Sequence, residues 1–245
     1  MPARKGTVVP CQATTRATRS NSNTSTTNIL CAMSLSSSPV DQHIHAFVVQ
    51  RMGCTARLRV ALNALEHEAL LALAGRSFSS PLLRKLYATD ECVIHTDCIR
   101  DWLGRAVSWV VDGDREGLLG LVSLSVWEQC GLRDGDSNLL EIGLLASERP
   151  SCGRVLLIQA LRECDALEKE GIVLELLGGK SNVPAYSLYR EFGFVHEPRM
   201  EEQRRRHMRN EFNDILVYLT LRRTAPGVPL LTPELLQRVL CLQIN

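Results

Sequence analysis

The stretch of residues 182–194 reads Asn-Val-Pro-Ala-Tyr-Ser-Leu-Tyr-Arg-Glu-Phe-Gly-Phe. Leu188 and Phe192 are four residues apart, so on a helix both side chains face the core. Asn182 can cap such a helix, and Gly193 can end it in the left-handed conformation. The stretch therefore predicts a short amphipathic helix between a capping residue and a glycine.

Three polar or small residues of this helix carry chemical information. Tyr189 lies two helical turns after Asn182, so both can line one cleft. A tyrosine hydroxyl there can protonate a departing thiolate, which is general-acid catalysis. Ala185 is small enough for a cofactor or a strand to approach the helix closely. An ordinary amphipathic helix is the structural alternative, but periodicity alone does not explain Asn182, Ala185 and Gly193 together.

The stretch resembles the acyl-CoA-binding helix of the GNAT N-acetyltransferase superfamily, N-x-x-A-x-x-L-Y-x-x-x-G-F, at every fixed position. The resemblance covers residues 56–222 and is specific over residues 141–194. It implies the GNAT acyl-CoA N-acyltransferase fold, an α/β (α+β) architecture with a mixed, mostly antiparallel sheet flanked by helices. Within the superfamily, Glu141-Ile followed by Pro-Ser-Cys resembles N-acetyltransferase 9-like members of the protein and ribosomal-protein N-acetyltransferase branch.

Hydrophobic periodicity and turn residues give an element order that alternates strands and helices, typical of α/β or α+β folds. Strands are predicted at residues 45–51, 56–62, 106–111, 117–127, 139–145, 172–177, 194–196 and 214–221. Helices are predicted at residues 66–78, 81–87, 97–105, 154–169, 183–191 and 233–242. We expect Gly171 to end the fourth helix at its C′ position, Thr232 to cap the last, and the strand at 172–177 to be apolar and buried on both faces.

Composition divides the chain into a tail, a domain and an extension. Residues 1–44 are rich in Ser, Thr and Asn and poor in acidic residues, so we expect a disordered tail or an organelle transit segment. Residues 45–224 are predicted to form the N-acetyltransferase domain, and residues 225–245 a C-terminal extension with one helix. The net charge of +1 and 5% aromatic content argue against a nucleic-acid binder.

The 9 cysteines form no CxxC pair, so we expect reduced thiols and no metal site. No apolar run approaches the roughly 20 residues of a membrane span, so no membrane association is expected. The cysteine usage leads us to expect a cytoplasmic location, with a mitochondrion or plastid as the alternative if the tail is a transit segment. The arginines at 204–206 and 209 predict a solvated hairpin, or alternatively a contact with the CoA 3′-phosphate.

A second motif is expected where the fifth predicted strand meets the following helix. In the superfamily a Q/R-x-x-G-x-G/A loop holds the CoA diphosphate there with backbone N–H groups and the helix dipole. This chain has Glu148-Arg-Pro-Ser-Cys-Gly-Arg: Gly153 matches the last glycine, while Ser151 and Glu148 replace the first glycine and the glutamine. Arg149 and Arg154 can reach phosphates. A tight strand-to-helix turn without ligand is the alternative.

The resemblance implies direct transfer of acetyl from acetyl-CoA to a primary amine, on a protein N-terminus, a lysine or a small molecule. Tyr189 is the candidate acid and Glu141 the candidate base, although Glu141 can equally be a solvent-facing carboxylate. A backbone N–H of Leu144 or Leu145 would stabilise the oxyanion. The implied acetyl-CoA-binding residues are Leu144, Leu145, Ala146, Glu148, Arg149, Ser151, Cys152, Gly153, Arg154, Asn182, Ala185 and Tyr189. The competing prediction is a non-catalytic GNAT-fold interaction module.

Overall fold

A computed structural model describes residues 56–127, 138–207 and 216–240. Among these described residues, seven strands form one sheet in the order β1-β2-β3-β4-β5-β7-β6. The strands are β1 (Ala56–Val60), β2 (Val107–Gly113), β3 (Gly117–Val126), β4 (Leu139–Ser147), β5 (Gly171–Leu176), β6 (Val195–His196) and β7 (Val217–Arg222). Within the described residues β4 and β5 pair in parallel and all other neighbours are antiparallel. The mixed, mostly antiparallel sheet expected from the sequence is therefore confirmed.

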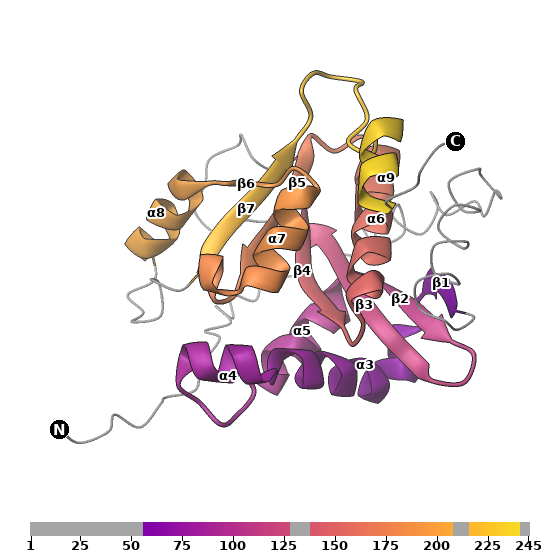
Figure 1. Cartoon of the computed structure of the whole chain (residues 1–245), viewed down its shortest axis with the longest axis vertical. Coiled ribbons are helices and arrows are strands. Elements are labelled where there is room, and N and C mark those ends of the chain that lie inside the picture. Colours follow the sequence, from indigo (N-terminus) through magenta and orange to yellow (C-terminus); the bar gives the residue numbers. More distant parts are fainter. Residues whose placement is uncertain (1–55, 128–137, 208–215, 241–245) are drawn as a thin grey trace, which may run out of the picture.

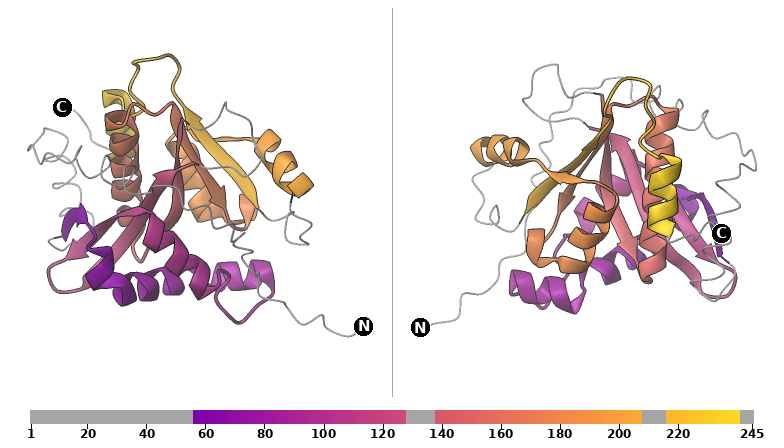
Figure 2. Two further views of the ribbon diagram at one scale, coloured as in Figure 1. Left: turned by 180° about the vertical axis from the view of Figure 1, so that it is seen from behind. Right: turned by 45° about the horizontal axis from the view of Figure 1, so that its top comes forward.

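Helices cover both faces of the sheet. They are α3 (Asn63–Phe78), α4 (Pro81–Tyr87), α5 (Thr96–Arg105), α6 (Pro150–Ala166), α7 (Val183–Glu191), α8 (Pro198–His207) and α9 (Pro233–Leu240), with a 3₁₀ turn at Gly179–Ser181. α6, α7 and α9 pack on one face, as Figure 1 shows, and share a core with Trp109, Leu140 and Ile142. α3 and α5 pack on the other face, seen from behind in Figure 2, and share a core with Val110, Leu121 and Leu144.

The arginines at 204–206 lie in a helix, so the prediction of a solvated hairpin is wrong for them, whereas Arg209 lies outside the described residues. Pro198 suits the first turn of α8, and Met200 is buried beside Trp127 and Tyr218. The carboxylate of Glu201 also accepts the Tyr218 backbone N–H at 3.1 Å. These contacts join α8 to residues that are distant in the sequence, so the local charge pattern did not predict them. The predicted strand at residues 45–51 lies outside the described residues, as does the tail. None of the helices of the described chain is long and apolar enough to span a membrane.

The end of α6 also differs from the prediction. The left-handed residue after the helix is Glu168, with φ of 53°, and not Gly171. The amides of Glu168 and Lys169 bond back to carbonyls of the last turn at 3.1 and 3.0 Å, which is a Schellman motif. Gly171 instead lies in β5, where a Cβ atom would sit 2.4 Å from the Leu221 carbonyl oxygen. The glycine is therefore required by strand packing and not by helix termination.

The C-terminal segment is held to α6 by a half-buried ion pair. Arg223 lies 2.8 Å from Asp165, and their side chains are 11% and 21% exposed. Arg223 also donates to the Cys164 carbonyl in the last turn of α6 at 3.3 Å and to the Lys169 carbonyl just after the helix at 2.6 Å. Asp165 accepts the backbone N–H groups of Leu230 and Leu231 at 2.8 and 3.0 Å. Thr232 caps α9 as expected, its Oγ1 accepting the Leu235 N–H. Residues 225–240 therefore form part of the packed domain.

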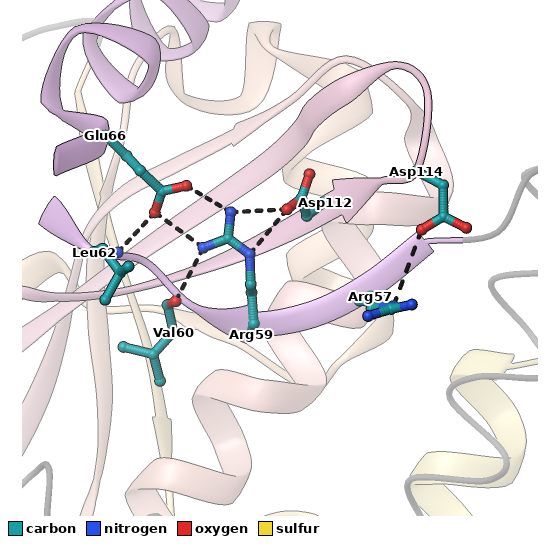
Figure 3. A network of polar contacts seen from close by, with 7 residues as sticks. All are labelled: Arg57, Arg59, Val60, Leu62, Glu66, Asp112 and Asp114. Carbon is teal, nitrogen blue, oxygen red and sulfur yellow. Dashed lines mark hydrogen bonds and ion pairs between the residues drawn. The ribbon is translucent and has the colours of Figure 1, made fainter.

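A second polar network joins β1, β2 and α3 (Figure 3). The guanidinium of Arg59 lies between two carboxylates, with Nε donating to Asp112 at 2.9 Å and Nη1 to Glu66 at 2.9 Å. Glu66 also accepts the Leu62 backbone N–H at 2.7 Å, which satisfies a donor at the start of α3. The hydrogen bond from Arg59 is the largest cause of the lowered pKa of Glu66. The network fixes the corner where the first strand enters the helix.

We predict that Glu66→Gln lowers the free energy of unfolding by about 1 kcal/mol at pH 7, because the ion pair is only partly shielded from water. Since the folded pKa of Glu66 lies below its ordinary value of 4.5, the ion pair stabilises fully above that pH. The difference between variant and wild type is therefore expected to shrink as the pH falls below about 4.5. Urea unfolding at pH 7 and pH 4 measures it. Glu68→Gln, an exposed change on the same helix, serves as the control.

A second stability prediction concerns the Arg223–Asp165 pair. Asp165→Ala removes the acceptor of two backbone N–H groups and leaves the Arg223 guanidinium, which is 11% exposed, with carbonyl acceptors but no carboxylate, so we expect a loss of about 3 kcal/mol. Hydrogen exchange of residues 228–240 should rise before the rest of the chain opens. Asp101→Ala, which breaks an exposed pair with Arg105, is the control and should cost under about 0.5 kcal/mol. Equal losses in the two variants would show that Asp165 does not hold the C-terminal segment.

Candidate functional site

The two central strands separate part of the way along their length. The parallel ladder of β4 and β5 runs from Leu139 beside Gly171 to Ile142 beside Leu174. Beyond that pair, residues 143–147 of β4 and 175–176 of β5 have no pairing with each other. We call these residues the β4–β5 divergence. The register of β3 against β4 shifts at the same place, so Gly143 is an extra residue without a partner, a β-bulge.

Where β4 and β5 diverge, one edge of β4 has backbone amides that face the side that β5 has left. The Glu148 N–H donates to the Leu119 carbonyl of β3 at 3.0 Å. Because hydrogen-bonded pairs alternate along an antiparallel ladder, the amides of Ala146 and Leu144 also face β3. The amide of Leu145 then faces the side that β5 has left. Of the two candidate oxyanion donors named from the sequence, the geometry favours Leu145 over Leu144.

The predicted diphosphate loop is mostly the first turn of α6. Only Glu148 and Arg149 lie between β4 and Pro150, which begins the helix because its fixed φ suits the first helical position. Pro150 has no N–H, and the Cys152 N–H is donated to the Arg149 carbonyl at 3.0 Å. This helix start therefore offers fewer free amide donors than a glycine-rich loop would.

The charged residues around the start of α6 are already paired. Glu148 lies 2.6 Å from Arg76 of α3, which is 72 residues away in sequence. Arg149 lies 3.7 Å from Glu116, and Arg154 lies 2.5 Å from Glu191 of α7. These side chains are partly exposed, so an anion could compete with the carboxylates for the arginines. The local charge is nonetheless balanced, which the sequence did not reveal.

Two other residues of this segment have packing roles. Cys152 is fully buried, and a Cβ on Gly120 of β3 would lie 3.0 Å from its Cβ. A Cβ on Gly153 would lie 3.1 Å from Leu188, so this glycine lets α6 approach α7 closely. The side chain of Ser151 is partly exposed. Of these three predicted ligand-binding residues, Ser151 has the side chain most accessible to a ligand.

Helix α7 spans the residues predicted for it, but Asn182 does not cap it. The Nδ2 group of Asn182 donates to the Leu177 carbonyl at 3.0 Å, at the end of β5, and no side-chain cap is formed. Asn182 therefore ties α7 to the strand before it. Gly193 ends the helix with φ of 95°, as expected, and the amides of Gly193 and Phe194 bond back to Arg190 and Tyr189.

Tyr189 is placed by that same helix end. Its ring meets the Phe194 ring edge to face with centroids 5.6 Å apart, the contact that commonly accompanies a Schellman motif. The side chain is 6% exposed, and burial raises the pKa of its hydroxyl above the ordinary value. Tyr189 is therefore protonated at neutral pH. Ala185, one turn earlier, is half-buried against the same core.

Two carboxylates lie on the sheet face opposite α6, next to the divergence. Glu141 of β4 is half-buried and accepts a hydrogen bond from Ser125 at 3.5 Å. Glu175 of β5 is exposed, and the Tyr218 hydroxyl donates to it. Glu141 is paired with Val173, and alternation places Glu175 on the same face as Val173. The prediction of an apolar β5 missed Glu175, although a single charge within that strand was a usable signal.

Among the described residues, no three His, Cys, Asp or Glu side chains gather in a way that could hold a metal ion. The arrangement instead combines an unpaired strand amide, a buried tyrosine and two nearby carboxylates. Such groups can orient a carbonyl, donate a proton and accept one.

Solved acetyltransferase structures are similar to this chain at low sequence identity, whereas no family model and no curated protein matches it. A presumed acetyltransferase of Acinetobacter baylyi ADP1 has a TM-score of 0.50 at 12% identity, over 72% of this chain and 96% of its own. One from Salmonella typhimurium, solved with acetyl-CoA as its cofactor, has 0.48 at 16% identity, over 70% and 98%. A ribosomal-protein-alanine N-acetyltransferase of Brucella melitensis has 0.47 at 16%, over 68% and 99%. The likeness to the Acinetobacter protein shows the fold alone.

One substitution can separate two roles of Asn182: capping of α7, and donation of a hydrogen bond from its side-chain amide to the Leu177 carbonyl. Aspartate is as good a helix cap as asparagine, but it cannot donate to the Leu177 carbonyl. We expect Asn182→Asp to lower the free energy of unfolding by about 1–2 kcal/mol at pH 7, and the loss to diminish at a pH where the new carboxyl is protonated. Chemical denaturation at pH 7 and pH 3.5, with Ser181→Asp as the exposed control, measures this. A stabilising Asn182→Asp would mean that residue 182 acts as a cap.

Proposed function

We propose that this chain, which has the GNAT acyl-CoA N-acyltransferase fold, is an acetyl-CoA-dependent N-acetyltransferase that acts on a primary amine. The observation that carries the proposal is the β4–β5 divergence, with the Leu145 amide on its open side and helix α7 following β5. A strand amide without a strand partner is available to a ligand carbonyl. The chain's match to the superfamily helix pattern at residues 182–194 supports the same activity.

The acetyl-CoA would lie along the start of α6 and beside α7. The first turn of α6 supplies the positive end of a helix dipole, which favours a diphosphate. Arg149 and Arg154 are placed to contact it after exchanging their present partners, Glu116 and Glu191. Ser151 and Ala185 are partly exposed along the same two helices and would border the ligand.

The reaction would proceed by direct attack. A carboxylate, Glu141 or Glu175, removes a proton from the acceptor ammonium, directly or through water, and the neutral amine attacks the thioester carbonyl. The Leu145 N–H stabilises the tetrahedral oxyanion. When this intermediate collapses, the carbon–sulfur bond breaks, Tyr189 gives its proton to the leaving thiolate, and the second nitrogen proton returns through water to the tyrosinate. Burial raises the pKa of Tyr189, so the hydroxyl carries its proton when the thiolate forms, and the same shift makes it a weaker acid than an exposed tyrosine.

The choice between the two carboxylates follows from their exposure. Glu175 is exposed, and its hydrogen bond from Tyr218 holds it in place, whereas Glu141 is half-buried beside Ser125. An ammonium arriving from solvent would reach Glu175 first. Protein N-termini, lysine side chains and small amines all carry the primary amine that this chemistry needs. The acidic residues here favour a cationic acceptor over a neutral one.

A non-catalytic GNAT-fold interaction module is the second candidate. It is favoured by the start of α6, where Pro150 removes an amide donor and the neighbouring arginines are paired with carboxylates. A protein that no longer binds acyl-CoA has no need for free donors at that position. We further propose a cytoplasmic location, from cysteines that read as reduced thiols, with a mitochondrion or plastid as the alternative, from the composition of residues 1–44.

Calorimetric titration of the full chain with acetyl-CoA tests the enzyme. We expect binding, and we expect Tyr189→Phe to lower kcat by about 10²-fold while changing the Kd by less than about threefold. Tyr186→Phe, on the same helix, is the matched control and should leave kcat unchanged. No binding at millimolar acetyl-CoA would reject the enzyme and favour the interaction module. Unchanged turnover in Tyr189→Phe would reject the acid role of Tyr189 alone.

The base is assigned by the pH dependence of kcat/KM in Glu141→Gln and Glu175→Gln. The variant that lacks the base should lose about 10²-fold in rate at neutral pH and also lose the acidic limb of the profile. A variant that only weakens acceptor binding would keep that limb and raise KM for the amine. If both profiles keep their acidic limb, neither carboxylate is the base.

A further inference from the structure

The bulge residue Gly143 has no room for a side chain. A Cβ built on it would lie 2.0, 2.1 and 2.7 Å from three atoms of the Trp102 benzo ring. Separations under about 3 Å are far inside van der Waals contact. The indole of Trp102 therefore occupies the space where every other residue type would carry its Cβ. The two residues lie on different elements, α5 and β4, and no pattern in the sequence connects them.

Trp102 is itself held firmly on α5. The residues at 99 and 103 are each 1% exposed and belong to the same apolar cluster as Leu144, next to Gly143 in β4. The guanidinium of Arg105 lies over the indole ring, 4.3 Å from its centroid, in cation–π geometry. These contacts anchor α5 on the sheet face beside β4, and the half-buried indole that it carries lies between Arg105 and Gly143.

The strand after the bulge needs such a support. Within the described residues, 144–147 of β4 pair with β3 on one edge only, because β5 has diverged, and Gly143 itself has no strand partner. Glycine is the residue with the greatest backbone freedom, and an unpaired glycine in a strand has little to restrain it. The direction of the Leu145 amide depends on this bulge, since the register shift sets which amides face β3.

We propose that Trp102 is a positioning residue for acyl transfer: its indole, packed on Gly143, fixes the bulge that directs the Leu145 N–H at the acyl carbonyl. The inference rests on the proposed acetyltransferase function. Trp102 lies outside the α7 and α6 motifs, on helix α5, for which the sequence predicted no role in catalysis. Trp102 acts through the backbone of β4 and not by contact with the reacting atoms.

The test compares ligands with and without a carbonyl. Wild type and Trp102→Leu are titrated with CoA and with the thioether ketone analogue of acetyl-CoA, which keeps the carbonyl and does not react. We expect both proteins to bind CoA with Kd values within about twofold of each other. We call the ratio of the Kd for CoA to the Kd for the ketone the carbonyl preference, and we expect the variant to lose it. The infrared carbonyl stretch of bound [¹³C]acetyl-CoA should move to higher frequency in the variant, because the hydrogen bond from the Leu145 N–H to the carbonyl oxygen weakens. We also expect kcat to fall about 10²-fold.

Two variants separate positioning from simple stability. Trp102→Phe keeps a ring against Gly143 and should retain most of the carbonyl preference. Trp109→Leu removes a buried tryptophan from the opposite face of the sheet, so it should destabilise the protein without changing that preference. An unchanged carbonyl preference and infrared frequency in folded Trp102→Leu would overturn the proposal. So would an equal loss of preference in Trp109→Leu.

Hydrogen exchange of the ligand-free full chain tests the support independently of CoA. Exchange of residues 139–147 should accelerate in Trp102→Leu by more than the change in global stability accounts for, and not in Trp109→Leu. Unchanged exchange in Trp102→Leu would overturn the proposal. If wild type binds neither CoA nor the ketone, the proposed function fails while this measurement still decides whether Trp102 restrains the bulge.

Discussion

The parallel pairing of β4 and β5 ends at Ile142 and Leu174, and most features of the candidate site depend on that early end. A strand interior normally has every amide paired, which leaves nothing for a ligand. Here one edge of β4 loses its partner over residues 143–147 while β3 continues to hold the other edge. The sheet thereby presents an ordered backbone donor without exposing its core. Gly143 lies at this point, and its bulge alters the course of β4 where the pairing with β5 ends.

The helices on the two faces then have different tasks. α6 is buried along most of its length and forms much of the core on one face of the sheet. Its Cys152 and Gly153 pack against β3 and α7. Its C-terminal end is bound by Arg223, and its N-terminal end lies beside the divergence. α5 supports β4 from the other face through Trp102. The strand amide is therefore positioned from both sides by residues distant in sequence.

Around the start of α6 the positive charges of the arginines are matched by neighbouring carboxylates. Arg76, Arg149 and Arg154 each have a carboxylate within 4 Å, so binding of an anion requires exchange of partners. Partly exposed ion pairs of this kind contribute little to stability, which makes such exchange inexpensive. The same pairs reduce the net attraction for a diphosphate. The affinity of this site thus depends on local pairing more than on the number of arginines in its sequence.

The sequence by itself determined the features that depend on near neighbours. It located α7 and its left-handed glycine, most strands and helices within a few residues, and Tyr189 in the helix pattern, because periodicity, caps and turn residues act over one or two helical turns. Contacts between distant residues decided the rest. The direction of the Leu145 amide, the pairing of Glu148 with Arg76, the bond from Asn182 to the end of β5, the helical state of residues 198–207 and the indole of Trp102 on Gly143 all arise from packing. Local propensity carries no information about which residues meet across the sheet, so tertiary structure alone could place them.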